Sequence, residues 1–156
     1  MTTWIFQGNP NYFDITGYLR ARTEIIWEAR QKSGLMAMGD TVYMWRADGG
    51  KPGTGGVIAR GTIVTLPEVI DDLAAVSFYP APHKANAKKK APRVKIHIDS
   101  MNLIHPVLTR GQAKKDPVLG GMHLMKVMVR TNYLLNAKEA KRLDDIYREA
   151  EHRENL

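Results

Sequence analysis

The sequence of 156 residues predicts a single α+β domain in which a curved or barrel-like mixed β-sheet is flanked by helices. Three observations predict this fold class. Short runs rich in β-branched and aromatic residues, bounded by glycine, proline or asparagine, recur along the chain and indicate strands. A capped helical pattern stands near each end. The composition, with 44% hydrophobic and 25% charged residues, is that of an ordinary globular domain.

The N-terminal part of the chain predicts a strand, a helix and a second extended segment. Residues 4–7 combine tryptophan, isoleucine and phenylalanine and end at a Gly-Asn-Pro turn, as a first strand does. Asp14 can cap a helix over residues 15–20. Residues 23–28 then form an extended segment that contains Trp27.

The clearest hairpin of the sequence follows the turn signal Gly39-Asp40. Residues 41–46 are rich in strand formers. Residues 48–56 hold five glycines and one proline and make a loop. Residues 57–64 are the expected partner strand.

The next segments differ in character from one another. Residues 79–92 carry three prolines and a run of three lysines, so we expect an exposed, mobile loop there. Residues 93–99 alternate polar and apolar side chains and predict a strand with one solvated face. We expect residues 102–108 to begin a short helix and residues 123–129 to form another strand.

The last predicted element is a helix from residue 137 to about residue 151, capped by Asn136. Its apolar stripe consists of Ala140, Leu143, Ile146, Tyr147 and Ala150. We expect the domain to span residues 1–150 and residues 151–156 to be a charged tail or a linker.

Positive charge is the most informative feature of the composition. Lysine and arginine total 23 against 16 acidic residues, which gives a net charge of +7, the electrostatic footprint of a polyanion binder. Phosphate contacts from clustered cations would position a duplex without reading its sequence. The alternative is a set of solvated surface lysines with no partner. One basic group consists of Lys84, Lys88, Lys89, Lys90 and Arg93, and a second of Arg110, Lys114 and Lys115.

Several classes of site and location are excluded or disfavoured. The chain has no cysteine, so disulfides and thiolate metal sites are excluded. No run of about 18 apolar residues predicts a membrane span, and the N-terminus lacks the pattern of a secretory signal, so we expect a cytoplasmic protein. The histidines lack metal-ligand spacing, no Gly-x-Ser-x-Gly motif occurs, and the glycine-rich loop does not open a helix. We therefore expect no catalysis, no metal and no cofactor.

The three tryptophans are better candidates for function. Trp4 is expected in the core of the first strand, whereas Trp27 and Trp45 each lie near the end of an extended segment. Both could pack in the core, or their faces could enclose a flat ligand, such as a base taken out of a duplex. Asn9 offers a donor and an acceptor for a base edge, and Asp40 could accept from an exocyclic amine or be a plain turn residue.

An ordered set of motifs resembles the EVE domain of the PUA-like superfamily, a relative of the YTH and SRA base readers. The set comprises WIFQGNP at residues 4–10, the lone Trp27, the Gly-Asp turn with the strand that ends at Trp45, and residues 55–59. The match covers about the first 65 residues. This variant resembles the EVE-like modules that precede HNH nuclease domains in modification-dependent restriction endonucleases.

The resemblance implies a PUA-like pseudo-barrel with one pocket for a flipped 5-methylcytosine, 5-hydroxymethylcytosine or related base. The implied partner is double-stranded DNA carrying modified cytosine, with any nuclease in a C-terminal or separate domain. Two alternatives remain, namely a stand-alone RNA binder and a small-molecule or nucleotide sensor. The residues expected in the base pocket are Trp27, Trp45, Asn9, Asp40, Gly8 and Tyr43. The expected phosphate contacts are Lys84, Lys88, Lys89, Lys90, Arg93, Arg110 and Lys114.

Overall fold

One curled mixed sheet organises the molecule. The computed structural model describes residues 1–154, and within them eight strands belong to this sheet, in the order β2-β6-β4-β3-β1-β8 with β5 paired to β6 and β7 paired to β4. The β1 and β3 strands run parallel, whereas the other pairs are antiparallel. The strands are β1 (Thr3–Gly8), β2 (Glu24–Glu28), β3 (Thr41–Arg46), β4 (Gly56–Ile63), β5 (Glu68–Ile70), β6 (Ala91–Met101), β7 (Leu108–Thr109) and β8 (Asn132–Leu134).

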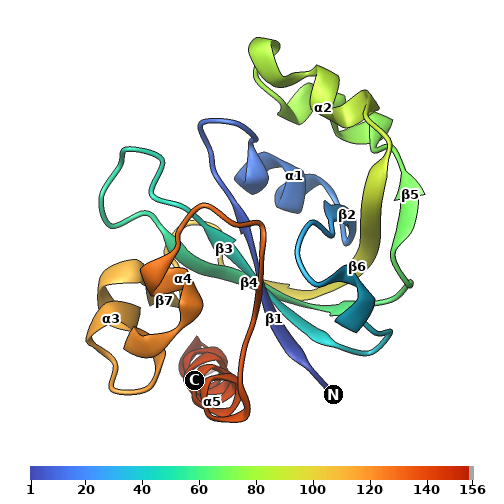
Figure 1. Cartoon of the computed structure of the whole chain (residues 1–156). Coiled ribbons are helices and arrows are strands. Elements are labelled where there is room, and N and C mark those ends of the chain that lie inside the picture. The colour runs from blue at the N-terminus through green and yellow to red at the C-terminus, as the bar shows by residue number, and fades with distance from the viewer. Residues whose placement is uncertain (155–156) are drawn as a thin grey trace.

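Helices cover the sheet in two groups (Figure 1). The α1 and α2 helices lie towards β2, β5 and β6, while α3, α4 and α5 gather on the other side of the sheet. The helices are α1 (Ile15–Ala21), α2 (Ala85–Lys88), α3 (Arg110–Lys115), α4 (His123–Lys126) and α5 (Ala137–Glu154). Short 3₁₀ turns occur at Ser33–Leu35, Leu73–Phe78, Ala81–His83 and Leu119–Gly121. Among the described residues, no helix is long and apolar enough to cross a membrane.

The sheet separates two hydrophobic cores because side chains alternate across a strand. On the inner face, Trp4 and Phe6 of β1 join Trp27 of β2 in a core covered by α1. On the outer face, Tyr43 and Trp45 of β3 pack in a second core with residues of α3, α4 and α5. Because both faces are buried, β3 is almost continuously apolar, as is typical of a strand covered on both sides.

The two edge strands of the sheet meet through side chains, and this contact closes the pseudo-barrel. Asn132 of β8 accepts hydrogen bonds at Oδ1 from the backbone N–H groups of Arg30 (2.7 Å) and Gln31 (3.0 Å), just after β2. Its Nδ2 donates to the carbonyl of Glu28 (2.9 Å). The side-chain oxygen of Gln31 accepts in return from the backbone N–H groups of Thr131 and Asn132. We call this contact the seam.

Most predicted elements are confirmed. The Asp14 side chain caps α1 by accepting from the backbone N–H of Gly17 (3.0 Å). The predicted hairpin is β3 paired antiparallel with β4, and residues 93–99 lie within β6. Asn136 caps α5 reciprocally with Glu139, since each side chain accepts from the other residue's backbone N–H.

Two secondary-structure predictions in the C-terminal half are wrong. The sequence predicts a strand over residues 123–129, but α4 and a turn occupy them. A short apolar run does not distinguish the two states, and Leu124 is buried here on a helical turn against the outer core. The segment 102–108 contains no helix, because its backbone N–H groups at Asn102 and Val107 bond to carbonyls of β4.

The predicted loop and tail are also more ordered than expected. Residues 79–92 contain a 3₁₀ turn and α2, and Ala87 is buried there while its carbonyl accepts from the backbone N–H of Asp72 (2.9 Å). The α5 helix continues to Glu154, so the described part of the expected tail is helical. Residues 155–156 of that tail lie outside the described residues.

Candidate base-binding pocket

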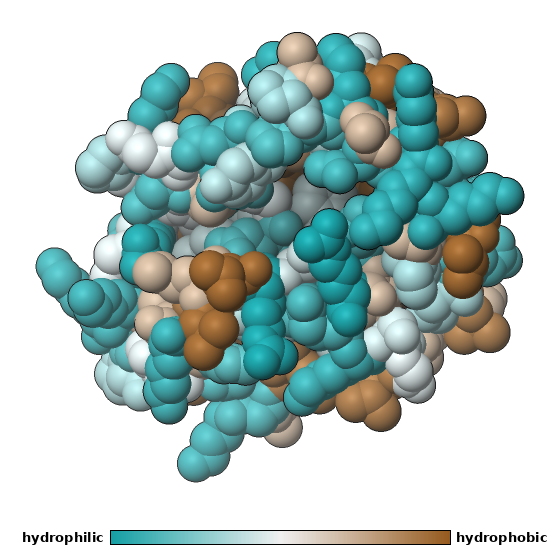
Figure 2. Space-filling view, turned by 45° about the horizontal axis from the view of Figure 1, so that its top comes forward, coloured by the Kyte–Doolittle hydropathy of each residue, from teal (hydrophilic) through white to brown (hydrophobic). Residues whose placement is uncertain are grey.

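A cavity of about 440 Å³ opens beside the seam. Its size lies within the usual range of small-ligand pockets, roughly 300–1,000 Å³. Figure 2 shows a hollow that opens among hydrophilic side chains, with hydrophobic side chains beside it. The lining residues come from β1, β2, α2, β6 and their connections, and from the turn before β8: Gln7, Gly8, Asn9, Tyr12, Phe13, Ile26, Trp27, Glu28, Arg30, Ala47, Asp72, Tyr79, Asn86, Arg93, Met128, Val129, Arg130 and Thr131.

Trp27 forms one wall of this cavity. Its side chain is held by Phe13, whose ring meets the indole edge-on at 5.6 Å between centroids. Gly8 lies against the same indole, and a Cβ atom there would stand 3.0 Å from the ring of Trp27. Glycine at this position therefore makes room for the tryptophan. The Trp27 residue is 7% exposed, and its buried Nε1 finds no hydrogen-bond partner among the described residues.

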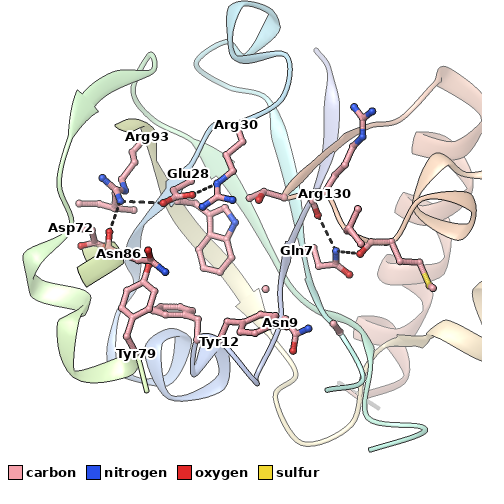
Figure 3. A pocket seen from close by; sticks show the side chains of 18 residues that line it. Gln7, Asn9, Tyr12, Glu28, Arg30, Asp72, Tyr79, Asn86, Arg93 and Arg130 are labelled. Atoms are coloured by element: carbon pink, nitrogen blue, oxygen red, sulfur yellow. Dashed lines mark hydrogen bonds and ion pairs between the residues drawn. The ribbon is translucent and has the colours of Figure 1, made fainter. Parts of the chain in front are cut away.

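Two tyrosines supply further aromatic surface. Figure 3 shows Tyr12 and Tyr79 on the side of the cavity opposite Glu28 and Arg30. Tyr79 contacts Phe13 at 4.7 Å between ring centroids, and Tyr12 meets His83 edge-on at 5.1 Å. Tyr12 remains more than half exposed. The cavity therefore combines a buried indole with a tyrosine that is accessible from solvent.

An ion-pair network that runs from the buried Arg93 to the exposed Arg30 forms the polar end of the cavity. The Glu28 carboxylate accepts from Arg93 (3.2 Å) and from Arg30, as Figure 3 shows. Arg93 is only 2% exposed and also donates to backbone carbonyls of Asn86 and Ile70. These bonds join α2 and β5 to Arg93 in β6. They also satisfy the guanidinium, since a buried charge is stable only when it is paired and hydrogen-bonded.

Asp72 carries a second buried polar atom without a partner. Its Oδ2 accepts from the Tyr18 hydroxyl (3.0 Å), whereas Oδ1 is buried and makes no hydrogen bond within residues 1–154. Burial raises the pKa of Asp72 above its ordinary value, against the opposing effect of the Tyr18 hydrogen bond. An unpaired buried acceptor is costly, so we expect Oδ1 to pair with a group from outside the chain, such as a water molecule or a ligand.

Asn9 and Gln7 mark the opposite end of the cavity (Figure 3). The Asn9 Oδ1 accepts from the backbone N–H of Asn11 (2.9 Å), which orients the side-chain amide. Gln7 Nε2 donates to the carbonyls of Met128 (2.8 Å) and Arg130 (2.9 Å). Gln7 thus fixes the turn of residues 127–131, which we call the rim turn.

Three residues expected in the pocket lie elsewhere. Trp45 is 1% exposed and faces the outer core with Tyr43, because the two-residue period of β3 turns both away from Trp27. Trp45 borders an adjoining cavity of about 200 Å³, which Arg110 also lines. Gln7, Asn9, Ala47 and Met128 line both cavities. Tyr43 is fully buried and donates to Asp144.

Asp40 is the third of these residues, and it is a structural group. The side chain is 2% exposed and accepts from Trp4 Nε1 (3.0 Å) and from the backbone N–H groups of Ala37 (2.9 Å) and Thr2 (3.2 Å). These bonds fasten the turn before β3 to the first strand, and they leave the carboxylate no access to the cavity lining.

The predicted cations divide between surface and interior. Lys88, Lys89 and Lys90 are exposed at the end of α2, whose Asn86 lines the cavity. Lys84 is exposed at the start of α2, and Lys114 is exposed on α3. Arg110 is partly exposed and pairs with Asp48 at 3.7 Å. Arg93 is not a surface contact, because its guanidinium is buried in the network described above.

Several lining residues were not anticipated from the sequence, among them Asp72, Tyr79 and Glu28. Asp72 and Tyr79 flank the turn Leu73–Phe78, which carries no motif by which a pocket could be recognised. Glu28 follows Trp27 directly, so its position at the strand end was the one available signal. Within residues 1–154, no group of three His, Asp or Glu side chains is arranged to hold a metal ion.

Comparison with known proteins is consistent with this architecture. Residues 2–143 match the model of the EVE domain, whereas no curated protein is matched by sequence. A hypothetical protein from Leishmania major is 19% identical, with a TM-score of 0.62 over 99% of this chain and 97% of that chain. Protein PSPTO5229 from Pseudomonas syringae is 17% identical, with a TM-score of 0.63 over 92% and 98%.

Human THYN1 protein, in complex with DNA containing 5-methylcytosine, is 14% identical, with a TM-score of 0.58 over 92% of this chain and 95% of that chain. At these identities the likenesses show the fold, and the PUA-like pseudo-barrel expected from the sequence is confirmed. The family model spans nearly the whole chain. The chain therefore belongs to the EVE domain family.

Proposed function

We propose that this domain binds double-stranded DNA carrying a modified cytosine and takes that base out of the duplex into the Trp27 cavity. One observation carries the proposal: a cavity with an aromatic wall is lined by two residues, Trp27 and Asp72, that each keep a buried polar atom without a partner among the described residues. A base offers both a flat face and a hydrogen-bonding edge. The THYN1 complex with methylcytosine-containing DNA supports the choice of ligand.

The chemistry of the lining fits a cytosine. The indole of Trp27 would stack on the base, and stacking on an aromatic side chain is worth about 1–3 kcal/mol per base. Asp72 Oδ1 would accept from the exocyclic amino group, which cytosine carries and thymine lacks. The Asn9 amide would donate to acceptors on the base. Trp27 Nε1 points along the plane of the stacked indole, so it would donate to the sugar or phosphate of the extruded nucleotide and not to the base.

The duplex itself would be held by charge. The exposed Lys88, Lys89 and Lys90 adjoin a helix whose Asn86 lines the cavity, so phosphates near the extruded base would meet them. Arg30 and Arg130 line the cavity as well and are exposed. These contacts would position the DNA without reading its sequence.

In this proposal the domain is the targeting module of a modification-dependent restriction system, and hydrolysis resides in a separate or C-terminal nuclease domain. The chain should therefore bind modified duplex without cutting it in the presence of Mg²⁺. Cleavage of the DNA by this chain alone would contradict that division of roles.

The decisive experiment is a binding series on one duplex that carries cytosine, 5-methylcytosine, 5-hydroxymethylcytosine, glucosylated cytosine or N6-methyladenine at a single position. We expect tighter binding of at least one modified cytosine than of cytosine or N6-methyladenine. Equal affinity for all five duplexes would exclude a modified-base reader. A preference for RNA of the same sequence, whatever the modification, would favour an RNA-binding function instead.

Trp27→Ala supplies the matched variant for this series. The variant should lose the preference for the modified duplex and keep the salt-dependent binding of unmodified DNA, since the lysines are unchanged. A circular dichroism spectrum and a melting curve like those of the wild-type protein would show that the variant is folded.

A further inference from the structure

The cavity rim carries an exposed aliphatic side chain for which the fold provides no packing reason. Val129, at the tip of the rim turn, is 91% exposed, and the neighbouring Met128 is also exposed. Both residues line the cavity. Surface turns favour Gly, Pro, Asn, Asp and Ser, whereas a β-branched residue at a tip leaves apolar surface in water.

The backbone beneath this side chain is firmly held. Gln7 Nε2 bonds to the carbonyls on both sides of Val129, those of Met128 and Arg130. The Tyr133 hydroxyl accepts from the backbone N–H of Arg130 (3.0 Å) and donates to another carbonyl of the rim turn. A valine has one stiff side-chain torsion, so Val129 loses little conformational freedom when it makes a contact.

Exposure alone does not distinguish Val129 from other surface aliphatics. Ile104 is 81% exposed and Val69 is 67% exposed, yet neither lines a cavity described above. Val129 differs in three respects together: it stands at the cavity mouth, its turn is fixed by two buried or half-buried side chains, and the exposed cations Lys126 and Arg130 flank it.

We propose that Val129, with Met128 beside it, is a wedge that fills the space left in the DNA duplex when the modified base enters the cavity. The inference rests on the proposed function. A base that leaves the stack exposes the faces of its neighbours to water, and apolar side chains inserted between base steps compensate for this loss. Because wedge and cavity share one rim, Val129 would enter the duplex where the base left it, and Lys126 and Arg130 would meet the adjacent phosphates.

The test compares Val129→Ser with the wild-type protein on two ligands, a 5-methylcytosine duplex and the same modified strand alone. A single strand has no vacancy to fill, so the wedge contributes only to duplex binding. We expect the Kd for the duplex to rise about tenfold, the scale of one aliphatic side chain left unburied, and the Kd for the single strand to stay unchanged. Val129→Ile should keep wild-type affinity for both.

Ile104→Ser is the matched control, since it removes a similarly exposed β-branched side chain away from the cavity and should change neither affinity. A second readout is the fluorescence of 2-aminopurine placed next to the modified base. In the wild-type complex the aliphatic wedge should keep this neighbour apart from the base across the vacancy and its emission high, while Val129→Ser should let the two bases stack and lower the emission.

The outcomes separate the wedge from the function on which it rests. If Val129→Ser binds the modified duplex as tightly as the wild-type protein does, Val129 is not a wedge, although the reader function stands. Equal losses for duplex and single strand would make Val129 a wall of the cavity and would also overturn the wedge. Equal affinity of the wild-type protein for modified and unmodified duplex would overturn both proposals.

Discussion

At the scale of single residues, Asp72 illustrates how a candidate binding group can reduce the stability of the fold. Burial raises its pKa above the ordinary value of 3.8. Between 3.8 and the raised value, the folded protein holds a proton that the unfolded chain has released. The stability contributed by this group therefore falls as the pH rises through that window, and at neutral pH the buried carboxylate is a net cost to folding.

Asp72→Asn should remove this cost, since its side-chain oxygen can still accept from Tyr18. We expect a higher free energy of unfolding than that of the wild-type protein at pH 7, and a difference that shrinks as the pH falls towards 3.8. Urea denaturation at several pH values measures this. If the variant is less stable than the wild-type protein at pH 7, or if the difference in the free energy of unfolding does not depend on pH, desolvation is not the main effect of Asp72 on stability.

The same substitution should weaken binding of modified cytosine. An amide that uses its oxygen for Tyr18 presents its NH₂ group to the exocyclic amine of the base, and two donors then face each other. We expect the affinity for the modified duplex to fall about 10- to 100-fold, the scale of one mismatched buried polar group, with the affinity for unmodified duplex unchanged. Gain of stability with loss of binding is the combined signature of a functional carboxylate.

Asp40→Ala should have the opposite profile. The substitution leaves Trp4 Nε1 and two backbone N–H groups without their acceptor, so we expect a loss of about 2–4 kcal/mol in the free energy of unfolding. The discrimination between modified and unmodified duplex should persist below the melting temperature, because Asp40 does not line the cavity. If the folded variant no longer distinguished modified from unmodified duplex, Asp40 would have to contribute to base binding after all.

Residue identities can be predicted from the sequence only where a local pattern fixes them. The WIFQGNP motif and the lone Trp27 predict Gly8, Asn9 and Trp27 at one site, and all three line the cavity. For Trp45, the sequence shows a strand that is apolar at nearly every position, and such a pattern does not say which alternate residues face which core. The position of Asp72 in the cavity lining depends on packing against Tyr18, which lies far away in the sequence. No local sequence pattern predicts such a contact.

At the scale of elements, α2 connects the cavity to the basic surface. Ala87 is buried, Asn86 lines the cavity and its carbonyl accepts from Arg93, and the following lysines are exposed. Proline and lysine content predicts a mobile loop here. The order comes instead from Arg93, which lies in the next strand and binds carbonyls of this segment, so the segment's own composition could not reveal it.

We expect replacement of Lys88, Lys89 and Lys90 by glutamine to weaken the binding of modified and unmodified duplex in parallel. Removal of one lysine–phosphate interaction should lower the slope of log K against log salt by about 0.9, so the slope should fall by roughly 2–3 for three lysines. Titrations over a range of salt concentrations measure this. A change in the ratio of the two affinities would show that the lysines contribute to reading the base.

A double variant of α5, Lys138→Gln with Lys141→Gln, is the control for this charge effect. Figure 1 places α5 and α2 at opposite ends of the molecule, and Lys141 already pairs with Asp145 at 3.1 Å. The affinity and the salt slope should both stay close to the wild-type values. An equal loss in both variants would mean that net charge, and not the position of the lysines, determines binding.

At the scale of the whole molecule, the cavity lies where the pseudo-barrel is closed by side chains. The edge strands β2 and β8 do not pair through a backbone ladder; Asn132 and Gln31 join them instead. A ladder would fill this space with backbone, whereas the seam leaves room beside it for the cavity. Trp27 comes from one edge strand and the rim turn leads into the other, so the geometry of the seam sets the geometry of the site.

Asn132→Ala therefore should affect stability and binding together. The backbone N–H groups of Arg30 and Gln31 lose their acceptor, so we expect a loss of about 2–4 kcal/mol in the free energy of unfolding.

Asp40→Ala is the matched control, since a comparable loss of stability there should leave base discrimination intact. Binding measured well below both melting temperatures separates the two variants. We expect at least a roughly tenfold loss of preference for modified duplex in Asn132→Ala alone, because Trp27 and the rim turn are no longer held at a fixed separation. Wild-type discrimination in that variant would mean that the two edge strands are positioned by their own cores, and that the seam closes the barrel without shaping the site.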